Sequence, residues 1–452
     1  MNRDSIDPER LAAFLDGRLT LEQRAEMLRQ IADSPELLEV VASVARRGSN
    51  PFQPRGPTAR GTFAGRRKEM EKLSNLLRQI GSGIGTNVLV TGESGTGKSS
   101  LLIQFKAIAE ERQPHALPFL VIHTDIDHTT TQQGLLAKIE AALHRSLTRS
   151  ERVRTSVKSF LNFASGVEAA GFRYHKPDLP ADEAQMERFA DRLAGTVNAA
   201  TRRRRWPFRA RHDGVLLIID EADKASPDLR LGSFLKLLIE RLKWRDCYRF
   251  MVAVAGLTEL KDVLRSGHDS AMRLFEVIEL QRMDVLGGME IVVEGLKRAS
   301  HEGERITIQP GALEKLLNMS DGLPHFTQQL AYSAFEVNVD DTIDEEDVEE
   351  GAYGPDGAVA SLARHYGWSD LPPGSDCEWA ILRVMADTPD VGISVTVISQ
   401  RTGIASSEVR DAVRKLSETG LVVAKSGADE SLRLANHALR AWVRLEASRP
   451  LE

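Results

Sequence analysis

The chain has 452 residues, more than one ordinary hydrophobic core holds, so its length predicts two to four folded units of roughly 100 to 200 residues each. Hydrophobic residues make up 42% and charged residues 27%, which is typical of a soluble globular protein and excludes a low-complexity chain. The net charge of -6 excludes a protein held on nucleic acid by its overall charge, so any such contact must be local.

Residues 1–47 have the spacing of two or three short amphipathic helices, with Pro8 at a helix start and a second helix over 21–31. This stretch resembles the small zinc-binding domain of anti-sigma factors. Gln30, Ser34 and Leu37 stand where that family has one His and two Cys ligands, so zinc is not expected. Two interpretations stay open, namely a metal-free interaction module and a helical appendage without a function of its own.

Targeting and redox signals point to the cytoplasm. Residues 1–9 contain acids and a proline where a secretory signal has a basic and then an apolar stretch. The longest apolar runs, 215–219 and 250–256, are far shorter than the roughly 20 residues of a membrane-spanning helix. Cys247 and Cys377 lie far apart and form neither a metal-ligand spacing nor a disulfide framework. We therefore expect a cytoplasmic protein in a reducing compartment, with no membrane segment.

The middle of the chain predicts an α/β domain. Residues 48–61 are rich in Gly and Pro turn pairs and predict a linker, after which an amphipathic helix is expected over 68–80. Five short apolar or β-branched runs then alternate with helical patterns, which predicts a parallel five-stranded sheet covered on both faces. The runs are 87–91, 118–124, 215–219, 249–255 and 276–280. We place this domain at 62–283, with an insertion at 146–213.

Three further segments follow the sheet. Residues 284–350 contain only helical periodicities and predict a helical lid. Residues 351–374 carry several prolines and predict a second linker. Residues 375–452 show three helical patterns and then a hairpin centred on Gly427, an order that predicts a winged helix.

The first apolar run leads directly into a glycine-rich loop and then a helix, the context that a P-loop requires. Its glycines let successive backbone N–H groups face phosphates. Lys98 offers a catalytic point charge to the β- and γ-phosphates, and Ser99 a hydroxyl ligand for Mg²⁺. The loop predicts binding of ATP or GTP. The expected nucleotide-binding residues are Gly92, Glu93, Ser94, Gly95, Thr96, Gly97, Lys98, Ser99 and Ser100.

The third run ends in two acids, at the sheet edge where open α/β sheets bind their ligands. Asp220 is expected to hold Mg²⁺ through its water shell. Glu221 is the expected catalytic residue that orients or deprotonates the attacking water. This pair predicts hydrolysis as well as binding. The alternative, an exposed acidic turn after a core strand, is disfavoured by the P-loop upstream.

Together these motifs resemble two related groups of enzymes, the origin-recognition-like AAA+ ATPases and the signal-transducing STAND ATPases. The resemblance covers about residues 60–350 and rests on the box at 63–69, the P-loop, the segment 217–223 and the segment 321–325. It implies a P-loop NTPase core with a nucleotide-controlled lid. It also implies that Arg66, in the first box, and His325, in the last segment, contact the nucleotide.

The chain departs from the family pattern at the positions that sense nucleotide. Leu257 stands where the family has a polar residue at the end of the fourth strand, and the nearby Thr258 is the alternative. His325 stands where the lid motif often has Arg, so its charge depends on pH. Arg273 lies where the family often has an arginine finger that reaches into a neighbouring subunit, but an exposed arginine without this role fits equally well.

Two regions offer a nucleic-acid contact. The insertion ends in arginines interleaved with aromatics at 202–211, which can neutralise phosphates and stack on bases, and a solvated charge run is the alternative. Residues 395–403 and 405–419 fit a helix-turn-helix, whose outward side chains could read a DNA groove. Acids and bases nearly balance over 375–452, and winged helices also dock proteins, so both interpretations stay open.

The resulting hypothesis is an ATP-binding and slowly hydrolysing AAA+ switch that couples nucleotide state to a winged helix. One alternative is a DNA-binding initiator or regulator whose affinity is set by ATP. The other is a STAND-like signalling scaffold that forms a homo-oligomer on binding ATP.

Overall fold

The computed structural model describes nine stretches of the chain. They are residues 50–57, 63–111, 118–149, 181–201, 212–299, 306–368, 376–388, 392–425 and 431–449. It also describes three single helical positions, Gln23, Met27 and Gln30. Apart from those three positions, the predicted N-terminal module lies outside the described residues, as does the basic run 202–211.

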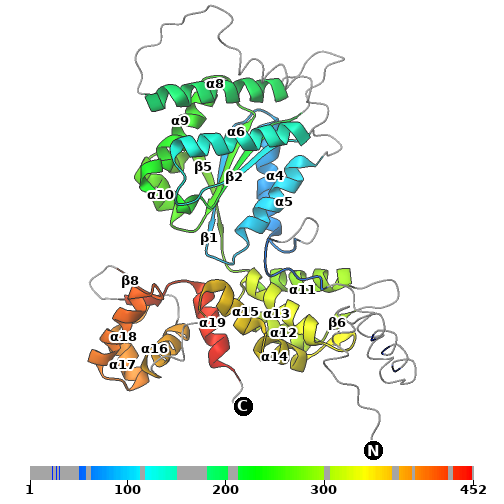
Figure 1. Ribbon diagram of the computed structural model, residues 1–452, viewed down its shortest axis with the longest axis vertical. Helices are drawn as coiled ribbons and strands as arrows, with labels where there is room; N and C mark the ends of the chain where they lie inside the picture. Colours follow the sequence, from blue (N-terminus) through cyan, green and yellow to red (C-terminus); the bar gives the residue numbers. More distant parts are fainter. Residues whose placement is uncertain are drawn as a thin grey trace, which may run out of the picture.

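A five-stranded parallel sheet forms the upper part of the molecule (Figure 1). Each of the five predicted runs forms one strand, so the predicted sheet is confirmed. The strand order is β2-β3-β4-β1-β5, which places the first strand between the last two. The residues of β1, β3 and β4 are almost all buried, as expected for strands covered on both faces. The strands are β1 (Asn87–Gly92), β2 (Leu120–Asp125), β3 (Val215–Asp220), β4 (Phe250–Gly256) and β5 (Phe275–Leu280).

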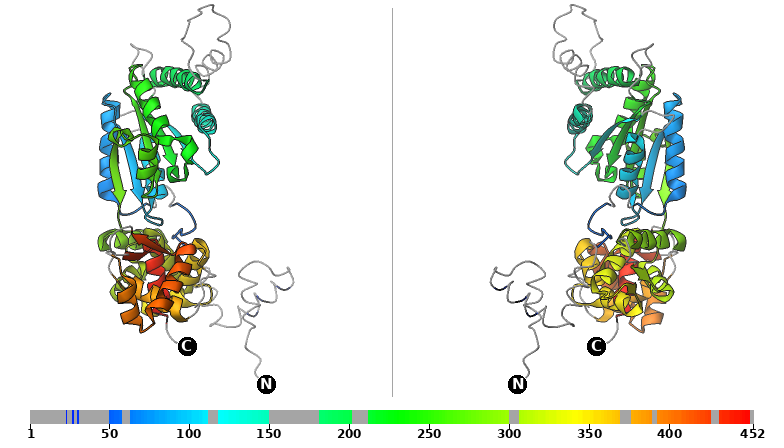
Figure 2. Two further views of the ribbon diagram at one scale, coloured as in Figure 1. Left: turned by 90° about the vertical axis from the view of Figure 1, so that its left-hand side faces the viewer. Right: turned by 90° about the vertical axis from the view of Figure 1, so that its right-hand side faces the viewer.

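Helices cover both faces of the sheet (Figure 2). On one face, α4 (Arg67–Gly81) and α5 (Lys98–Glu110) bury side chains such as Leu77 and Phe105. On the other face, α6 (Gln132–Arg149), α8 (Ala181–Thr201) and α9 (Leu231–Lys243) form a second core with β2, β3 and β4. The short elements η1 (Ala222–Lys224), η2 (Pro227–Leu229), α10 (Leu260–Gly267) and η3 (Ala271–Leu274) complete this layer.

A bundle of four helices, which we call the lid, follows the sheet over most of the segment where a helical lid was predicted. These helices are α11 (Val285–Ala299), α12 (Pro310–Ser320), α13 (Pro324–Val337) and α14 (Glu345–Tyr353). Proline at the first position starts α12 and α13, and a capping box between Asp344 and Asp347 starts α14. The expectation of helices alone was wrong in one respect, because β6 (Thr307–Ile308) and β7 (Thr342–Ile343) form a small parallel pair.

Residues 50–57, which we call the strap, lie along this bundle although a linker was predicted there. The Phe52 ring is buried against Phe335 of α13, and it fills the space that a Cβ at Gly295 of α11 would need. The Asn50 side chain donates a hydrogen bond to the Tyr332 carbonyl oxygen at 3.1 Å. The strap is therefore bound to the lid through buried apolar surface and side-chain hydrogen bonds.

The second predicted linker, 351–374, is not a linker over its described part. It contains the end of α14 and a further helix, α15 (Ala358–Tyr366), which ends at Gly367 with a φ of 73°. Val359, Leu362 and Trp368 are buried. Gly and Pro residues flank this amphipathic helix and do not interrupt it, which is why their density was misleading.

The C-terminal unit, residues 376–449, has three helices and then a hairpin, in the predicted order, and ends in a further helix that was not predicted. It consists of α16 (Asp376–Ala386), α17 (Val395–Thr402), α18 (Ser406–Glu418), β8 (Val422–Lys425), β9 (Ser431–Leu434) and α19 (His437–Ala447). Its core is continuous with Leu323 and Phe326 of the lid and with α15. The Trp442 indole also donates a hydrogen bond to the Val359 carbonyl oxygen at 3.2 Å. None of the helices in the described ranges combines the length and the apolar character needed to cross a bilayer.

Candidate nucleotide-binding site

The glycine-rich loop lies at the carboxyl edge of the sheet, between β1 and α5. Gly95 and Gly97 have φ values of 78° and 91°, which L side chains rarely adopt. A Cβ at Gly92 would lie 2.8 Å from the Leu280 carbonyl oxygen of β5. The loop thus needs glycine at these positions.

Lys98 begins α5 and folds back over the loop. Its Nζ atom donates hydrogen bonds to the carbonyl oxygens of Gly92, at 2.8 Å, and Glu93, at 2.7 Å. Burial lowers the pKa of Lys98, whereas the nearby carboxylates, led by Asp223 and Asp220, act in the opposite direction. The ammonium group is therefore hydrogen-bonded to two neutral backbone carbonyl groups of the loop. An anion can take the place of these carbonyl groups as its partner.

Asp220 ends β3 beside the first turn of α5. Its carboxylate is hydrogen-bonded to the Ser99 side chain and accepts a hydrogen bond from the Glu221 N–H at 2.8 Å. Burial is the main cause that raises the pKa of Asp220. The two residues predicted to bind Mg²⁺ thus lie in direct contact. No group of three or more His, Cys, Asp or Glu side chains suited to a metal occurs within the described ranges.

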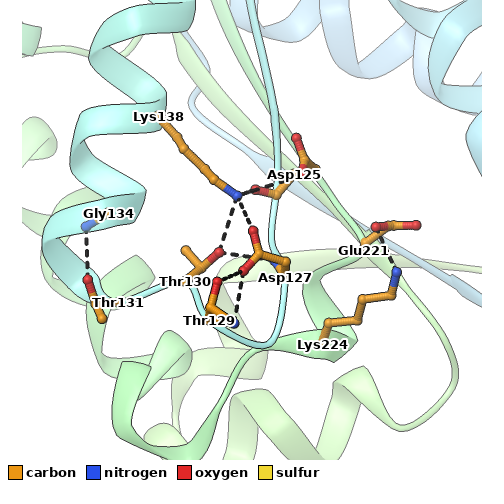
Figure 3. A network of polar contacts seen from close by, with 9 residues as sticks. All are labelled: Asp125, Asp127, Thr129, Thr130, Thr131, Gly134, Lys138, Glu221 and Lys224. Carbon is orange, nitrogen blue, oxygen red and sulfur yellow. Dashed lines mark hydrogen bonds and ion pairs between the residues drawn. The ribbon is translucent and has the colours of Figure 1, made fainter.

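Glu221 adopts a left-handed conformation with a φ of 52°. Its Oε2 atom lies 2.8 Å from Lys224 Nζ, and this ion pair raises the pKa of Lys224 (Figure 3). Both side chains are largely exposed. In this arrangement the predicted catalytic carboxylate forms an ion pair with Lys224, from the following turn. No motif in the sequence indicated this partner.

A second polar network fixes the loop after β2, next to this edge. Lys138 of α6 donates a hydrogen bond to Asp127 Oδ2 at 2.7 Å and another to Thr130 Oγ1 at 3.2 Å (Figure 3). The Thr129 N–H donates to Asp127 Oδ1 at 2.8 Å. The hydrogen bond from Lys138, followed by those from Thr129, holds the pKa of Asp127 well below its usual range. The network gives this loop a defined shape beside Glu221.

Asp223 connects the end of β3 to the end of β4. Its Oδ1 atom accepts a hydrogen bond from the Leu257 N–H at 2.9 Å. Leu257 lines the cavity described below, whereas Thr258 is exposed and does not line it. Arg273 is exposed in η3 and lies outside the cavity lining. The Asp-Glu-Ala-Asp segment contained Asp223, so a signal for this residue was present in the sequence.

Arg66 is hydrogen-bonded to the backbone of the glycine-rich loop. Its guanidinium donates to the Thr96 carbonyl oxygen at 3.2 Å, pairs with Glu69 Oε1 at 3.1 Å and also donates to the Gln281 carbonyl oxygen. Its side chain is only 7% exposed. This geometry connects Arg66 to the backbone of the P-loop and of the segment after β5, although the residue also lines the cavity.

His325 is the second residue of α13 and packs on the loop from the lid. Its N–H donates to the Gly95 carbonyl oxygen at 3.3 Å, and its Nδ1 atom lies 3.0 Å from the Tyr366 hydroxyl. Burial, and to a smaller extent His365, lower the pKa of His325 to about 4. The ring is therefore neutral at pH 7. Tyr366 lies in the segment predicted as a linker, and no motif in the sequence pointed to it.

A cavity of about 540 Å³ joins these elements. Its walls are the P-loop from Ser94 to Ser100, the strap, the Asp220–Lys224 turn, and the lid with the end of α15. Gly92 and Glu93 are not among the lining residues. The Glu93 carboxylate instead accepts a hydrogen bond from the His437 N–H of α19, at 2.8 Å from Oε2. Most predicted site residues therefore meet in one space, while Glu93 faces the C-terminal unit.

Residues 62–243 match the family model described as the AAA ATPase domain. The chain is also similar to solved structures of proteins from Aeropyrum pernix and Pyrobaculum aerophilum. With the Aeropyrum pernix ORC2 protein in ADPNP-ADP complexes it shares 16% identity and a TM-score of 0.47, over 89% of this chain and 98% of that one. With Cdc6p from Pyrobaculum aerophilum it shares 15% identity and a TM-score of 0.42, over 88% of this chain and 98% of that one. A search of curated proteins finds no match.

Proposed function

We propose that the chain, whose residues 62–243 form an AAA ATPase domain, binds Mg-ATP in the cavity at the carboxyl edge of its sheet. We further propose that it hydrolyses ATP slowly and uses the nucleotide state to control its C-terminal unit, which we interpret as a winged helix. The observation that carries the proposal is the convergence of Lys98, Ser99 and Asp220 on one cavity beside a glycine loop.

The residues present fit the expected ligands. Glycines at positive φ turn the amides of the loop inward, and Lys98 supplies a positive charge, as a triphosphate requires. Ser99 would supply a hydroxyl ligand for Mg²⁺, and the Asp220 carboxylate beside it would hold the ion through its water shell. When bound, Mg²⁺ supplies charge that stabilises the transferred phosphoryl group.

In the proposed reaction, Glu221 takes a proton from a water molecule that attacks the γ-phosphorus atom in line with the leaving oxygen. The bond from phosphorus to the β-γ bridging oxygen breaks, and the products are ADP and inorganic phosphate. Lys98 stabilises negative charge on the phosphate oxygens. Glu221 must first leave Lys224, with which it pairs at 2.8 Å. This requirement supports a slow basal rate.

The contacts of the C-terminal unit support coupling. Glu93, inside the P-loop, binds the first N–H of α19, and the core of the unit includes Leu323 and Phe326 of the lid. A movement of the P-loop or lid therefore acts directly on α19. These contacts are a buried apolar core and a carboxylate at a helix N-terminus. Both depend on how the two parts are placed, so a shift of one part changes the contacts of the other.

Phosphate release by the wild-type protein and by Glu221→Gln tests the enzymatic part. We expect the substitution to lower the rate by roughly 10²-fold or more, the usual contribution of a general base, while ATP binding is retained. Glu240→Gln, on α9 away from the cavity, is the matched control and should leave the rate unchanged. Equal rates for wild type and Glu221→Gln would remove Glu221 from this role.

A second candidate function is ATP-regulated DNA binding. The exposed face of α18 carries Arg410, Arg414 and Lys415, a polar surface on the second helix of the proposed helix-turn-helix. Filter binding of duplex DNA in ATP, ADP and no nucleotide tests it. Light scattering under the same three conditions tests the alternative of a scaffold that oligomerises on ATP.

A further inference from the structure

Three hydrogen bonds connect the P-loop, α15, the lid and the strap in one line. The Tyr366 hydroxyl is hydrogen-bonded to the Ser94 side chain and lies 3.0 Å from Nδ1 of His325. The His325 ring is in turn hydrogen-bonded to the backbone of Pro54. All four residues line the nucleotide cavity. The line therefore connects the phosphate loop to the strap.

The direction of each bond can be worked out from the chemistry. Proline has no N–H, so the Pro54 carbonyl oxygen accepts and the His325 ring donates. Nδ1 faces Tyr366, which leaves Nε2 as the donor to Pro54. A neutral ring protonated on Nε2 has a lone pair on Nδ1, so Tyr366 donates to it. The Tyr366 oxygen is then free to accept from Ser94.

Packing fixes Tyr366 at the centre of this line. A Cβ at Gly95 would lie 2.8 Å from the Tyr366 hydroxyl oxygen, so the hydroxyl rests against the bare backbone of the P-loop. The Tyr366 ring stacks on Trp368 with centroids 4.5 Å apart and planes at 11°. Trp368 packs on Trp442 of α19 at 5.5 Å. One side chain thus contacts the P-loop, the lid and the core of the C-terminal unit.

We propose that Tyr366 is a positioning residue of the nucleotide site, which holds the lid and strap on the P-loop through an uncharged His325. This inference rests on the proposed function, because it concerns the same cavity. The resemblance to origin-recognition-like ATPases implies a cation at the lid position. Here the ring is committed to one acceptor and one donor, so it connects protein segments and does not act as a charge directed at phosphate.

The two interpretations of His325 predict opposite effects of substitution. Glutamine has one donor and one acceptor, so it can accept from Tyr366 and donate to Pro54 as the neutral histidine does. Arginine has only donors, so it cannot accept from Tyr366. A neutral connection therefore tolerates His325→Gln and is broken by His325→Arg. A charged phosphate sensor is improved by His325→Arg and lost in His325→Gln.

Calorimetric titration of the full chain with ATP in Mg²⁺ distinguishes these outcomes. We expect His325→Gln to bind ATP within roughly twofold of wild type, and His325→Arg and Tyr366→Phe to bind roughly fivefold more weakly, the usual effect of one lost neutral hydrogen bond. Tyr366→Phe should cause a smaller loss in a His325→Ala background, because only the hydrogen bond to Ser94 is then left to lose. Tyr248→Phe, exposed and outside the cavity lining, is the matched control.

Thermal unfolding without nucleotide separates this role from a purely structural one. Tyr366→Phe keeps the ring that stacks on Trp368, so its melting temperature should stay close to that of wild type while its ATP affinity falls. Unchanged ATP affinity in Tyr366→Phe, or tighter binding by His325→Arg than by His325→Gln, would overturn the proposal. Failure of the wild-type protein to bind ATP would instead overturn the proposed function.

The dependence of binding on pH provides a second readout. The groups that face the His325 ring are His365 and Tyr366 of α15, and Arg55 and Lys98 line the same cavity. We expect the ratio of the ATP affinities of wild type and His325→Gln to stay constant from pH 6 to pH 8, roughly one unit either side of neutrality. A wild-type advantage that grows as pH falls to 6 would show a charged histidine and contradict the proposal.

Discussion

The two sides of the nucleotide cavity are built from different chemistry. On the sheet side, Lys98, Asp220 and Glu221 bring charged groups to the carboxyl edge of the sheet. Burial lowers the pKa of Lys98 and raises the pKa of Asp220, and each shift favours the neutral form of the side chain. On the lid side, Tyr366 and His325 meet the P-loop through neutral hydrogen bonds and aromatic stacking. Charge is placed where phosphate is expected, and neutral contacts connect the P-loop to the lid.

The largest expected effect is on the charged side. Lys98→Ala should weaken ATP binding roughly 100-fold, because a charge-assisted contact to phosphate is among the stronger polar interactions in proteins. Equilibrium dialysis with labelled ATP measures the change. Lys243→Ala, exposed at the last turn of α9, is the matched control and should bind as wild type does. Similar affinities for the two variants would contradict the division between the two sides.

Gly95→Ala tests the point where the two sides touch. The new methyl group meets the Tyr366 hydroxyl and imposes a side chain on a φ of 78°. We expect roughly tenfold weaker ATP binding, measured by the same dialysis. Because Tyr366→Phe removes the clashing oxygen, it should restore part of this loss. If it restores none, backbone strain alone explains the effect and Tyr366 is not in contact with the working P-loop.

Glu93→Ala tests whether a charged P-loop side chain contacts the C-terminal unit and not the nucleotide. Its carboxylate caps α19 and does not line the cavity, so ATP affinity should stay within roughly twofold of wild type. The free energy of unfolding should fall by about 1 kcal/mol, as for loss of a helix N-terminal partner. Urea unfolding together with ATP titration measures both. A large loss of ATP affinity with unchanged stability would reverse this assignment.

The smallest effect is expected at Lys224. Lys224→Met frees Glu221 from an exposed ion pair, and such pairs contribute little to stability. We expect phosphate release to rise roughly two- to fivefold, with ATP affinity unchanged. A multiple-turnover phosphate assay measures the rate, and Lys236→Met on α9 serves as control. A slower Lys224→Met enzyme would show that this lysine assists the reaction instead of restraining Glu221.

The sheet and its charged edge could be predicted because their signals are local. A buried strand gives a continuous apolar run, and a P-loop needs glycine, lysine and a hydroxyl at fixed spacing in a single segment. The neutral side could not be predicted in this way. Pro54, His325 and Tyr366 come from three distant segments, and Tyr366 is the last residue of a helix whose flanking prolines and glycines suggested a linker. Their meeting depends on tertiary packing.

Whether a triphosphate binds at the loop around Lys98 is measured by calorimetric titration of the purified wild-type chain with ATP in Mg²⁺. We expect saturable heat with one ATP bound per chain, and loss of that heat in Lys98→Ala. Folded wild-type protein that gives no heat of binding with ATP, ADP or GTP would contradict it.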